Sequence, residues 1–199
     1  MTKGGYTVFV QVLNESKRII PFLKNFENND NLIVLLDEED NETETILLDK
    51  MVRFVKKPDG FKNTPWKEQE EWILNQTKSN YVLFANASMF FPQELLKIFH
   101  DISIEGKYDG VKNSMYYWSH GKIVQKPLFF KKSTACYFFR RNIVETSKSR
   151  IHSEFNLPLQ SRYYLSKPNF DQSIHVFRDD DMPVVTTKHI KYAIKEATE

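Results

Sequence analysis

The amino-acid sequence predicts an α/β protein, a three-layer α/β/α sandwich around a mixed, mostly parallel sheet. In the first hundred residues, strand-like runs alternate with segments of helical periodicity. The runs at 32–36 and 81–85 are apolar at every position, which is typical of strands that a parallel sheet buries on both faces. The intervening segments are long enough for the right-handed helical crossovers that join parallel strands.

The first strand and helix have clear local signals. β-branched and aromatic residues dominate 6–13, as expected of a strand. A helix is expected at 15–26, after Asn14 as its N-cap, because apolar residues recur there at helical spacing. The residues expected on its buried face are Ile19, Ile20, Leu23 and Phe26.

The next elements follow in the same alternation. A second strand at 31–37 leads into a helix within 37–51, and a short third strand at 51–58 ends in a loop with Pro58 and Gly60. The segment 64–79 predicts a helix with Thr64 as its cap and Pro65 at the first helical position. A fourth strand at 81–88 and a helix at 92–102, opened by Pro92, complete this half.

The second half is less regular. The segments 110–119 and 122–132 alternate like antiparallel strands around a turn at Gly121, and 185–199 predicts a threonine-capped helix. Since no repeat, low-complexity tract or flexible linker interrupts the chain, a single domain over 1–199 is expected.

Composition excludes several classes of protein. With 199 residues, 41% hydrophobic and 27% charged, the chain is neither disordered nor fibrous. A net charge of +2 does not indicate nucleic-acid binding. The single Cys136 excludes an intrachain disulfide and fits a reducing compartment. No run approaches the roughly 18 apolar residues of a membrane helix, so a cytoplasmic location is expected, with peripheral membrane contact left open.

Polar residues follow three of the expected strands, at 11–14, 37–40 and 86–88. In open α/β sheets, ligands bind outside the carboxyl ends of the strands. A carboxylate at 37–40 would be placed to bond a ribose hydroxyl or a base N–H. The same acidic stretch also suits a solvated loop and a helix N-terminus, where the helix dipole favours negative charge. The residues alone leave both interpretations open.

The segment VFVQVLNESKRI contains a strand that ends in an Asn-Glu step, and LIVLLDEEDNETET contains a strand that ends in an Asp. With these motifs the first hundred residues resemble a family 2 glycosyltransferase of the GT-A fold, a Rossmann-like fold, in which the second of these strands ends in a nucleotide-binding Asp. KEQEEWILNQTKSNYVLFANASMFFPQELLKI has the layout of the helix, the strand ending in Asp-x-Asp, and the next helix. FFRRN, RIHSEF and SIHVFRDDDMPVVTTKHIKYAIKEA resemble, in order, motifs of the sub-family that decorates lipopolysaccharide cores.

The resemblance implies transfer of a sugar, with inversion, from a UDP- or GDP-linked donor to a hydroxyl of a glycan or other acceptor. Residues 1–100 would bind the donor and residues 101–199 the acceptor. The implied roles are nucleotide binding for Gln11, Leu13, Asn14, Asp37 and Lys67; the diphosphate and metal region for Asn86, Ser88 and His175; the acceptor side for His152, Trp118 and Arg140; and the general base for Glu154, with Asp171 as second choice.

The sequence departs from the family pattern at the metal motif. Asn86-Ala87-Ser88 replaces Asp-x-Asp, and neutral oxygens are poor ligands for a hard cation, so Mn²⁺ or Mg²⁺ is expected to bind weakly. No organic cofactor is expected. Ser153 stands where a glutamate is usual, and Glu70 where a helical arginine is usual. These departures favour an alternative, a degenerate glycosyltransferase that binds a nucleotide, glycan or partner protein without catalysis.

Structural roles stay open for several of these residues. His175 also suits a strand edge, Trp118 a packed core and Arg140 an exposed turn.

Overall fold

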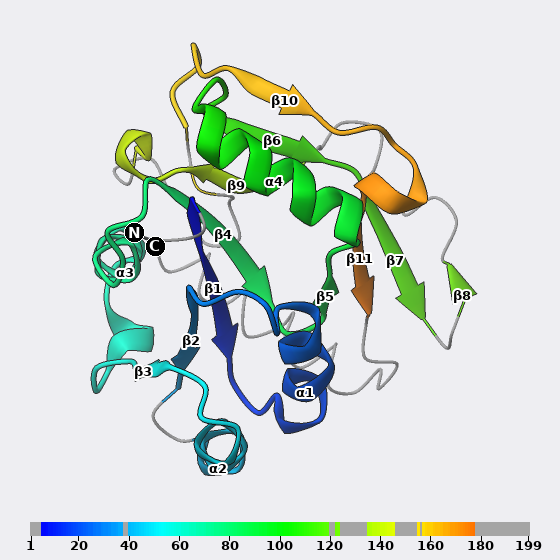
Figure 1. The fold of residues 1–199 in the computed structure, drawn as a ribbon. Coiled ribbons are helices and arrows are strands. Elements are labelled where there is room, and N and C mark those ends of the chain that lie inside the picture. The colour runs from blue at the N-terminus through cyan, green and yellow to red at the C-terminus, as the bar shows by residue number, and fades with distance from the viewer. Residues whose placement is uncertain are drawn as a thin grey trace.

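The computed structural model describes residues 5–37, 40–119, 122–123, 135–145, 155 and 157–177. A seven-stranded sheet forms its centre, with helices packed against both faces (Figure 1). The strands are β1 (Tyr6–Val12), β2 (Leu32–Leu36), β3 (Phe54–Lys56), β4 (Tyr81–Asn86), β5 (Met89–Phe90), β6 (Gly110–Asn113), β7 (Met115–Ser119), β8 (Lys122–Ile123), β9 (Ala135–Arg140), β10 (Tyr163–Leu165) and β11 (Ile174–Phe177). The helices are α1 (Ser16–Asn25), α2 (Asn41–Asp49), α3 (Trp66–Leu74) and α4 (Gln93–Glu105), with short 3-10 turns η1 (Phe61–Asn63), η2 (Arg141–Ile143) and η4 (Phe170–Gln172).

The large sheet is mixed and mostly parallel, as predicted. Its strand order is β10-β6-β9-β4-β1-β2-β3. Strands β4, β1, β2 and β3 run parallel to one another, and β10 runs parallel to β6. Only β9 runs against its neighbours, β4 and β6. The carboxyl ends of the four adjacent parallel strands therefore lie along one edge of the sheet.

Alternating burial along the strands separates two cores. Val8 and Val10 of β1 point to the face that α1 and α4 cover. Phe9 of β1 and Leu35 of β2 point to the opposite face, where Ile73 of α3 packs. Because successive side chains of a strand alternate between faces, each polar residue at a strand end can be assigned to one of these two faces.

A second, four-stranded sheet with the order β5-β11-β7-β8 was not predicted. The expected strand at 110–119 is divided at Ser114, so that β6 joins the large sheet and β7 the small one. The backbone carbonyl of Ser114 accepts a hydrogen bond of 3.0 Å from the amide of Ile174, which draws β7 toward β11. The antiparallel pairing of 110–119 with the segment after Gly121 is confirmed for β7 and β8. Residues 124–132 and 185–199, expected as strand and helix, lie outside the described residues.

Helix α1 corrects two predictions. Its N-cap is Glu15, while Asn14 has a φ of 56°, a left-handed conformation that asparagine tolerates. Ile20 is exposed and Phe22 is buried instead. The reason is geometric, since 19, 22, 23 and 26 form the i, i+3, i+4, i+7 stripe and residue 20 lies outside it.

The start of α3 also differs from the prediction. Pro65 occupies the cap position itself, and the hydroxyl of Thr64 donates to the carbonyl of Phe61 at 2.7 Å, which closes η1 rather than capping α3.

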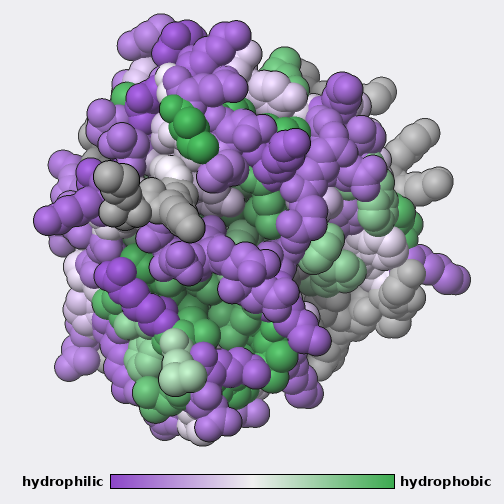
Figure 2. Space-filling view, viewed as in Figure 1, coloured by the Kyte–Doolittle hydropathy of each residue, from purple (hydrophilic) through white to green (hydrophobic). Residues whose placement is uncertain are grey.

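The surface in Figure 2 is mostly hydrophilic, and hydrophobic side chains gather in its lower part, over α1 and α2. Ile20, Leu23, Met51 and Val52 line a groove there, and Met51 is strongly exposed. Among the described residues, no helix is long and apolar enough to cross a membrane.

Candidate functional site

Four polar side chains lie at the carboxyl ends of the adjacent parallel strands. Gln11 is near the end of β1, Asp37 follows β2, Lys57 follows β3 and Asn86 ends β4. The sheet register aligns Gln11 with Asn86 on one side and with Leu35 on the other. We refer to Gln11, Asp37, Lys57 and Asn86 as the strand-end row.

All four side chains belong to the same face of the sheet. Backbone hydrogen bonds continue the ladder beyond the strands, from the Asp37 amide to Val12 at 3.3 Å and from the Lys57 amide to Leu36 at 2.9 Å. Because side chains two positions apart point to the same face, the residues of the row are on the face of Phe9 and Leu35. The strand-end row lies at the edge of the core that α3 covers. A ligand bound at the open edge of the sheet would contact the side chains of the row.

Within the row, Asp37 and Lys57 form an ion pair. The Lys57 Nζ lies 3.4 Å from Asp37 Oδ2, and the two side chains are only 10% and 20% exposed. Burial lowers the pKa of Lys57, and the attraction of Asp37 opposes that shift. The Lys57 ammonium also lies 5.8 Å from the ring centre of Phe61. The row thus holds a mostly buried cation directly beside the carboxylate.

Lys57 was not predicted as a site residue, although the alternation of side chains along a strand contains the signal. Lys56 and Lys57 are adjacent and point to opposite faces, so Lys56 pairs with Glu44 of α2 at 2.7 Å. Since a third parallel strand was expected at 51–58, its last polar residue on the face of Asp37 could have been identified.

Asp40 gives the acidic stretch a structural role as well. Its side chain is buried, and Oδ1 accepts a hydrogen bond from the Thr43 amide at 3.1 Å, which caps α2. Its Oδ2 accepts from the Asn14 amide at 2.7 Å, so it ties the loop after β1 to the start of α2. Leu13 in that loop is exposed. Asp40 therefore shapes the loop beside the strand-end row, while Asp37 belongs to the row.

The turn after β4 carries the residues expected to face a diphosphate. Asn86 is exposed, Ala87 is buried and Ser88 is half-buried, with its carbonyl accepting from the Phe177 amide at 2.8 Å. In the part of the chain that the structure describes, no group of three or more His, Cys, Asp or Glu residues could hold a metal ion. The side-chain ligands that Asn86 and Ser88 offer are one amide oxygen and one hydroxyl.

His175 is engaged within the protein through both ring nitrogens. It is 1% exposed; Nδ1 accepts from Trp118 Nε1 at 3.0 Å, and Nε2 donates to the Phe170 carbonyl at 2.9 Å. The ring stacks on Tyr116 at 5.4 Å between centroids. In this arrangement His175 has no free nitrogen for a metal, and it instead orients the indole of Trp118.

Arg140, expected on the acceptor side, lies at the edge of the sheet opposite the strand-end row. It pairs with Tyr81, the first residue of β4, whereas Asn86 is the last. Its guanidinium bonds Asp109 at 3.2 Å and the Gly106 carbonyl at 2.7 Å. These contacts give Arg140 a structural role at the amino ends of the strands.

Among the described residues, Lys67 and Asp171 do not join the strand-end row. Lys67 is exposed and lies 3.7 Å from Glu71 on the surface of α3. Glu70, where the resemblance placed an arginine, is fully buried under the same helix. Asp171 is exposed in η4, which precedes β11. At the other end of β11, the Phe177 amide donates to the Ser88 carbonyl. His152 and Glu154 lie outside the described residues.

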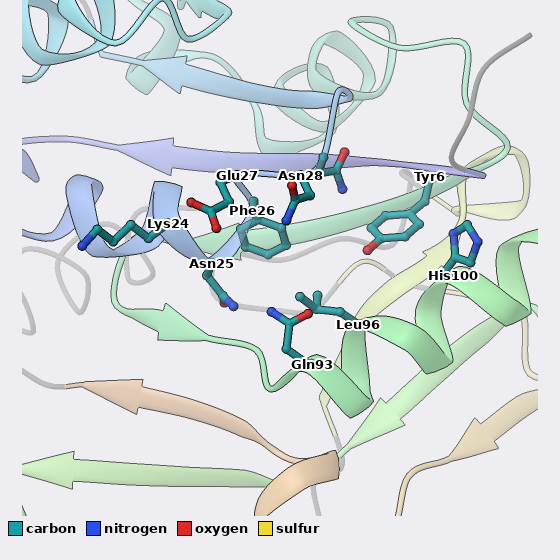
Figure 3. Close-up of a pocket in the computed structure, with 10 residues that line it drawn as sticks. Tyr6, Lys24, Asn25, Phe26, Glu27, Asn28, Gln93, Leu96 and His100 are labelled. Atoms are coloured by element: carbon teal, nitrogen blue, oxygen red, sulfur yellow. The ribbon is translucent and has the colours of Figure 1, made fainter.

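A separate small pocket lies between the end of α1 and α4 (Figure 3). Tyr6 and His100 flank it on one side and Lys24 and Glu27 on the other. Burial raises the pKa of Tyr6 to about 12, although a hydrogen bond with Asn29 opposes the shift. Tyr6 begins β1, so this pocket lies at the edge of the sheet opposite the strand-end row.

Comparison with known proteins shows the fold. The chain is similar to crystal structures of glucosyl-3-phosphoglycerate synthase from Mycobacterium tuberculosis. The complex with Mn²⁺, UDP-glucose and phosphoglyceric acid has a TM-score of 0.51 at 18% identity, over 71% of this chain and 58% of that chain. The synthase alone gives a TM-score of 0.51 at 18% identity, over 71% and 59%.

The chain thus spans less than two thirds of the length of these neighbours. No family model and no curated protein matches the sequence. The large mixed sheet and its crossover helices therefore form a GT-A fold, as predicted.

Proposed function

We propose that this protein is a glycosyltransferase that moves a sugar from a nucleotide-sugar donor to an acceptor hydroxyl. The observation that carries the proposal is the strand-end row, since ligands of open α/β sheets bind at this edge. The neighbouring synthase, which shares the fold, has been crystallised with UDP-glucose. A GT-A fold with a carboxylate and a buried cation at its strand ends supports the same class of donor here.

The row supports a division of roles along the donor. Asp37 accepts a hydrogen bond from the ribose or the base of a UDP- or GDP-linked sugar, and Gln11 with the loop at Leu13 and Asn14 lines the base. Lys57 supplies positive charge beside the nucleotide. Asn86 and Ser88, one strand further along, face the diphosphate.

A divalent cation fits this chain poorly. The synthase structure contains Mn²⁺. In this chain the turn after β4 offers the neutral side-chain oxygens of Asn86 and Ser88, and hard cations prefer carboxylates. We therefore propose weak cation binding, and none of the steps below depends on a metal.

Transfer with inversion is a single in-line displacement. The acceptor oxygen bonds to the anomeric carbon as the bond from that carbon to the diphosphate oxygen breaks, and a carboxylate takes the proton of the acceptor hydroxyl. Glu154 is the proposed base. Asp171 is the weaker choice because it lies exposed at the end of β11 that is distant from Ser88.

A second candidate function is binding without catalysis. It is favoured by one observation, the neutral Asn86-Ala87-Ser88 turn in the place where the resemblance expects two acids. In that case a nucleotide would still bind at Asp37 but no sugar would be transferred.

A transfer assay with Glu154→Gln separates the two functions. Wild-type protein is incubated with UDP- and GDP-sugars and a glycan mixture, and the released nucleoside diphosphate is measured. Glu105→Gln, an exposed glutamate at the end of α4, is the matched control.

Loss of a general base should lower the rate about 10²–10⁴-fold in Glu154→Gln while donor affinity stays within about twofold. Wild-type rates in Glu154→Gln would exclude it as the base. Nucleotide binding with no transfer by the wild-type protein would favour the second function.

A further inference from the structure

A pocket of about 580 Å³ lies between α1 and the strands β5 and β11. It begins beside the strand-end row, because Ala87 and Ser88 of the turn after β4 form part of its wall. Phe22 and other α1 residues form the opposite wall, and α1 covers the sheet face away from α3. The pocket and the strand-end row therefore flank the Asn86–Ser88 turn from two sides.

Aromatic rings line this pocket and are partly exposed. Phe90 is 41% and Phe177 is 46% exposed, and both contribute to the lining. His175 is aligned with Phe90 in the register of the small sheet, as Phe177 is with Trp118, so all four side chains are on one face of that sheet.

The side chain of Trp118 holds the ring of Phe177 in place. Its ring stacks on Trp118 at 5.8 Å between centroids and an interplanar angle of 23°. Trp118 is in turn held by its hydrogen bond to His175. One of the lining rings is thus already held in a single orientation, which lowers the entropy cost of binding a flat apolar surface.

Polar side chains also line the pocket. Arg18 of α1 lines the pocket and is oriented by its ion pair with Glu15 at 3.1 Å. Lys24 and Gln93 are exposed and also reach the lining. The side chain of Asn25 instead bonds both backbone groups of Phe91, at 2.8 and 2.9 Å, so it belongs to the framework.

This combination matches the chemistry of a sugar ring. A pyranoside has an apolar face of C–H groups and a rim of hydroxyls, so it requires an aromatic surface together with hydrogen-bond donors. A purely hydrocarbon ligand would form no hydrogen bonds with Arg18, Lys24 and Gln93. A small anion would make no contact with the phenyl rings. A pocket of this size and mixed lining is within the range of small-ligand sites.

We propose that the pocket between α1 and β11 binds a pyranoside ring of the acceptor glycan, stacked against Phe177. The identity of this ring as an acceptor rests on the proposed function, because the pocket adjoins the turn where the donor diphosphate would lie. Arg18 and Gln93 donate hydrogen bonds to its hydroxyls. Specificity for a glycan would thus come from the small sheet that the sequence analysis did not predict.

Saturation-transfer NMR with methyl β-D-glucopyranoside, methyl β-D-galactopyranoside and methyl α-D-mannopyranoside tests the proposal. At about 20 mM glycoside, at least one should receive saturation on its ring protons. Phe177→Leu keeps apolar volume but removes the ring, and should weaken binding about fivefold. Phe170→Leu is the matched control, since Phe170 is 50% exposed, packs on His175 and does not line the pocket.

Three outcomes would overturn the proposal. They are no saturation of any of the three glycosides, equal binding by the wild type and Phe177→Leu, and equal weakening by Phe177→Leu and Phe170→Leu. Calorimetry with UDP and GDP on the same samples separates this proposal from the proposed function. Nucleotide binding without glycoside binding refutes only the acceptor pocket, whereas glycoside binding without nucleotide binding leaves a carbohydrate site and refutes the transferase.

Discussion

Replacing Asp37 with asparagine perturbs the strand-end row with almost no change in shape. A hydrogen bond to a charged group contributes about 1.5–3 kcal/mol, so loss of the carboxylate should weaken nucleotide binding about 10- to 150-fold. The ion pair opposes part of this loss, because Lys57 is freed to attract the diphosphate more strongly. We expect the net effect to remain a weakening, since the amide cannot replace the charged acceptor.

The same substitution has a cost in stability. Asp37 and Lys57 are both mostly buried, and breaking a buried pair by removing one partner costs about 3–5 kcal/mol. Because the side chains of Asp37 and Lys57 are still 20% and 10% exposed, we expect a loss of stability at the lower end of that range. Lys57 would respond with a further fall of its pKa, because the attraction that opposed the shift is gone.

Calorimetric titration with UDP and GDP, together with urea unfolding, measures both effects. The variants are Asp37→Asn, the double variant Asp37→Asn with Lys57→Met, and Asp59→Asn as the control for an exposed acid in the following loop. The double variant should regain stability without regaining affinity. If Asp37→Asn binds UDP and GDP as the wild type does, Asp37 does not contact the nucleotide and the reasoning fails.

Three further predictions concern other parts of the molecule. Asn86→Asp combined with Ser88→Asp should bind Mn²⁺ more tightly than the wild type, measured by calorimetry; tight binding by the wild type would contradict the argument from neutral ligands. Arg140→Met should lower the free energy of unfolding by about 1–3 kcal/mol and leave the transfer rate unchanged, and a loss of transfer at equal stability would return Arg140 to the site. Between pH 10 and 12 the wild type should lose about 2–3 kcal/mol of stability relative to Tyr6→Phe, because only the unfolded tyrosine releases its proton there; parallel pH profiles would refute this.

The position of Asp37 could be predicted because a parallel sheet constrains it. An apolar run that ends in an acid fixes both the strand and its carboxyl end, and neighbouring parallel strands bring such ends together. The same reasoning placed Gln11 and Asn86. Lys57 was not identified because the third strand is short. The burial of Lys57 also depends on a partner, Asp37, that lies 20 positions away in the sequence.

The second half resisted prediction for a different reason. A residue pattern that alternates from 110 to 119 does not reveal that the chain changes sheets at Ser114. Its outcome depends on pairing with β11, about 60 residues later, which no local signal specifies. His175 and Trp118 were singled out separately, and only the fold shows that they form one hydrogen-bonded pair.

A crystal structure of the protein with UDP-glucose, or with the nucleotide sugar that titration selects, tests the central claim most directly. The expected result is a base and ribose beside Asp37 and Gln11, with the diphosphate over the Asn86–Ser88 turn and the sugar directed toward Phe177. A nucleotide bound at another edge of the sheet, or a saturated sample with Asp37 and Lys57 still paired and untouched by the ligand, would contradict it.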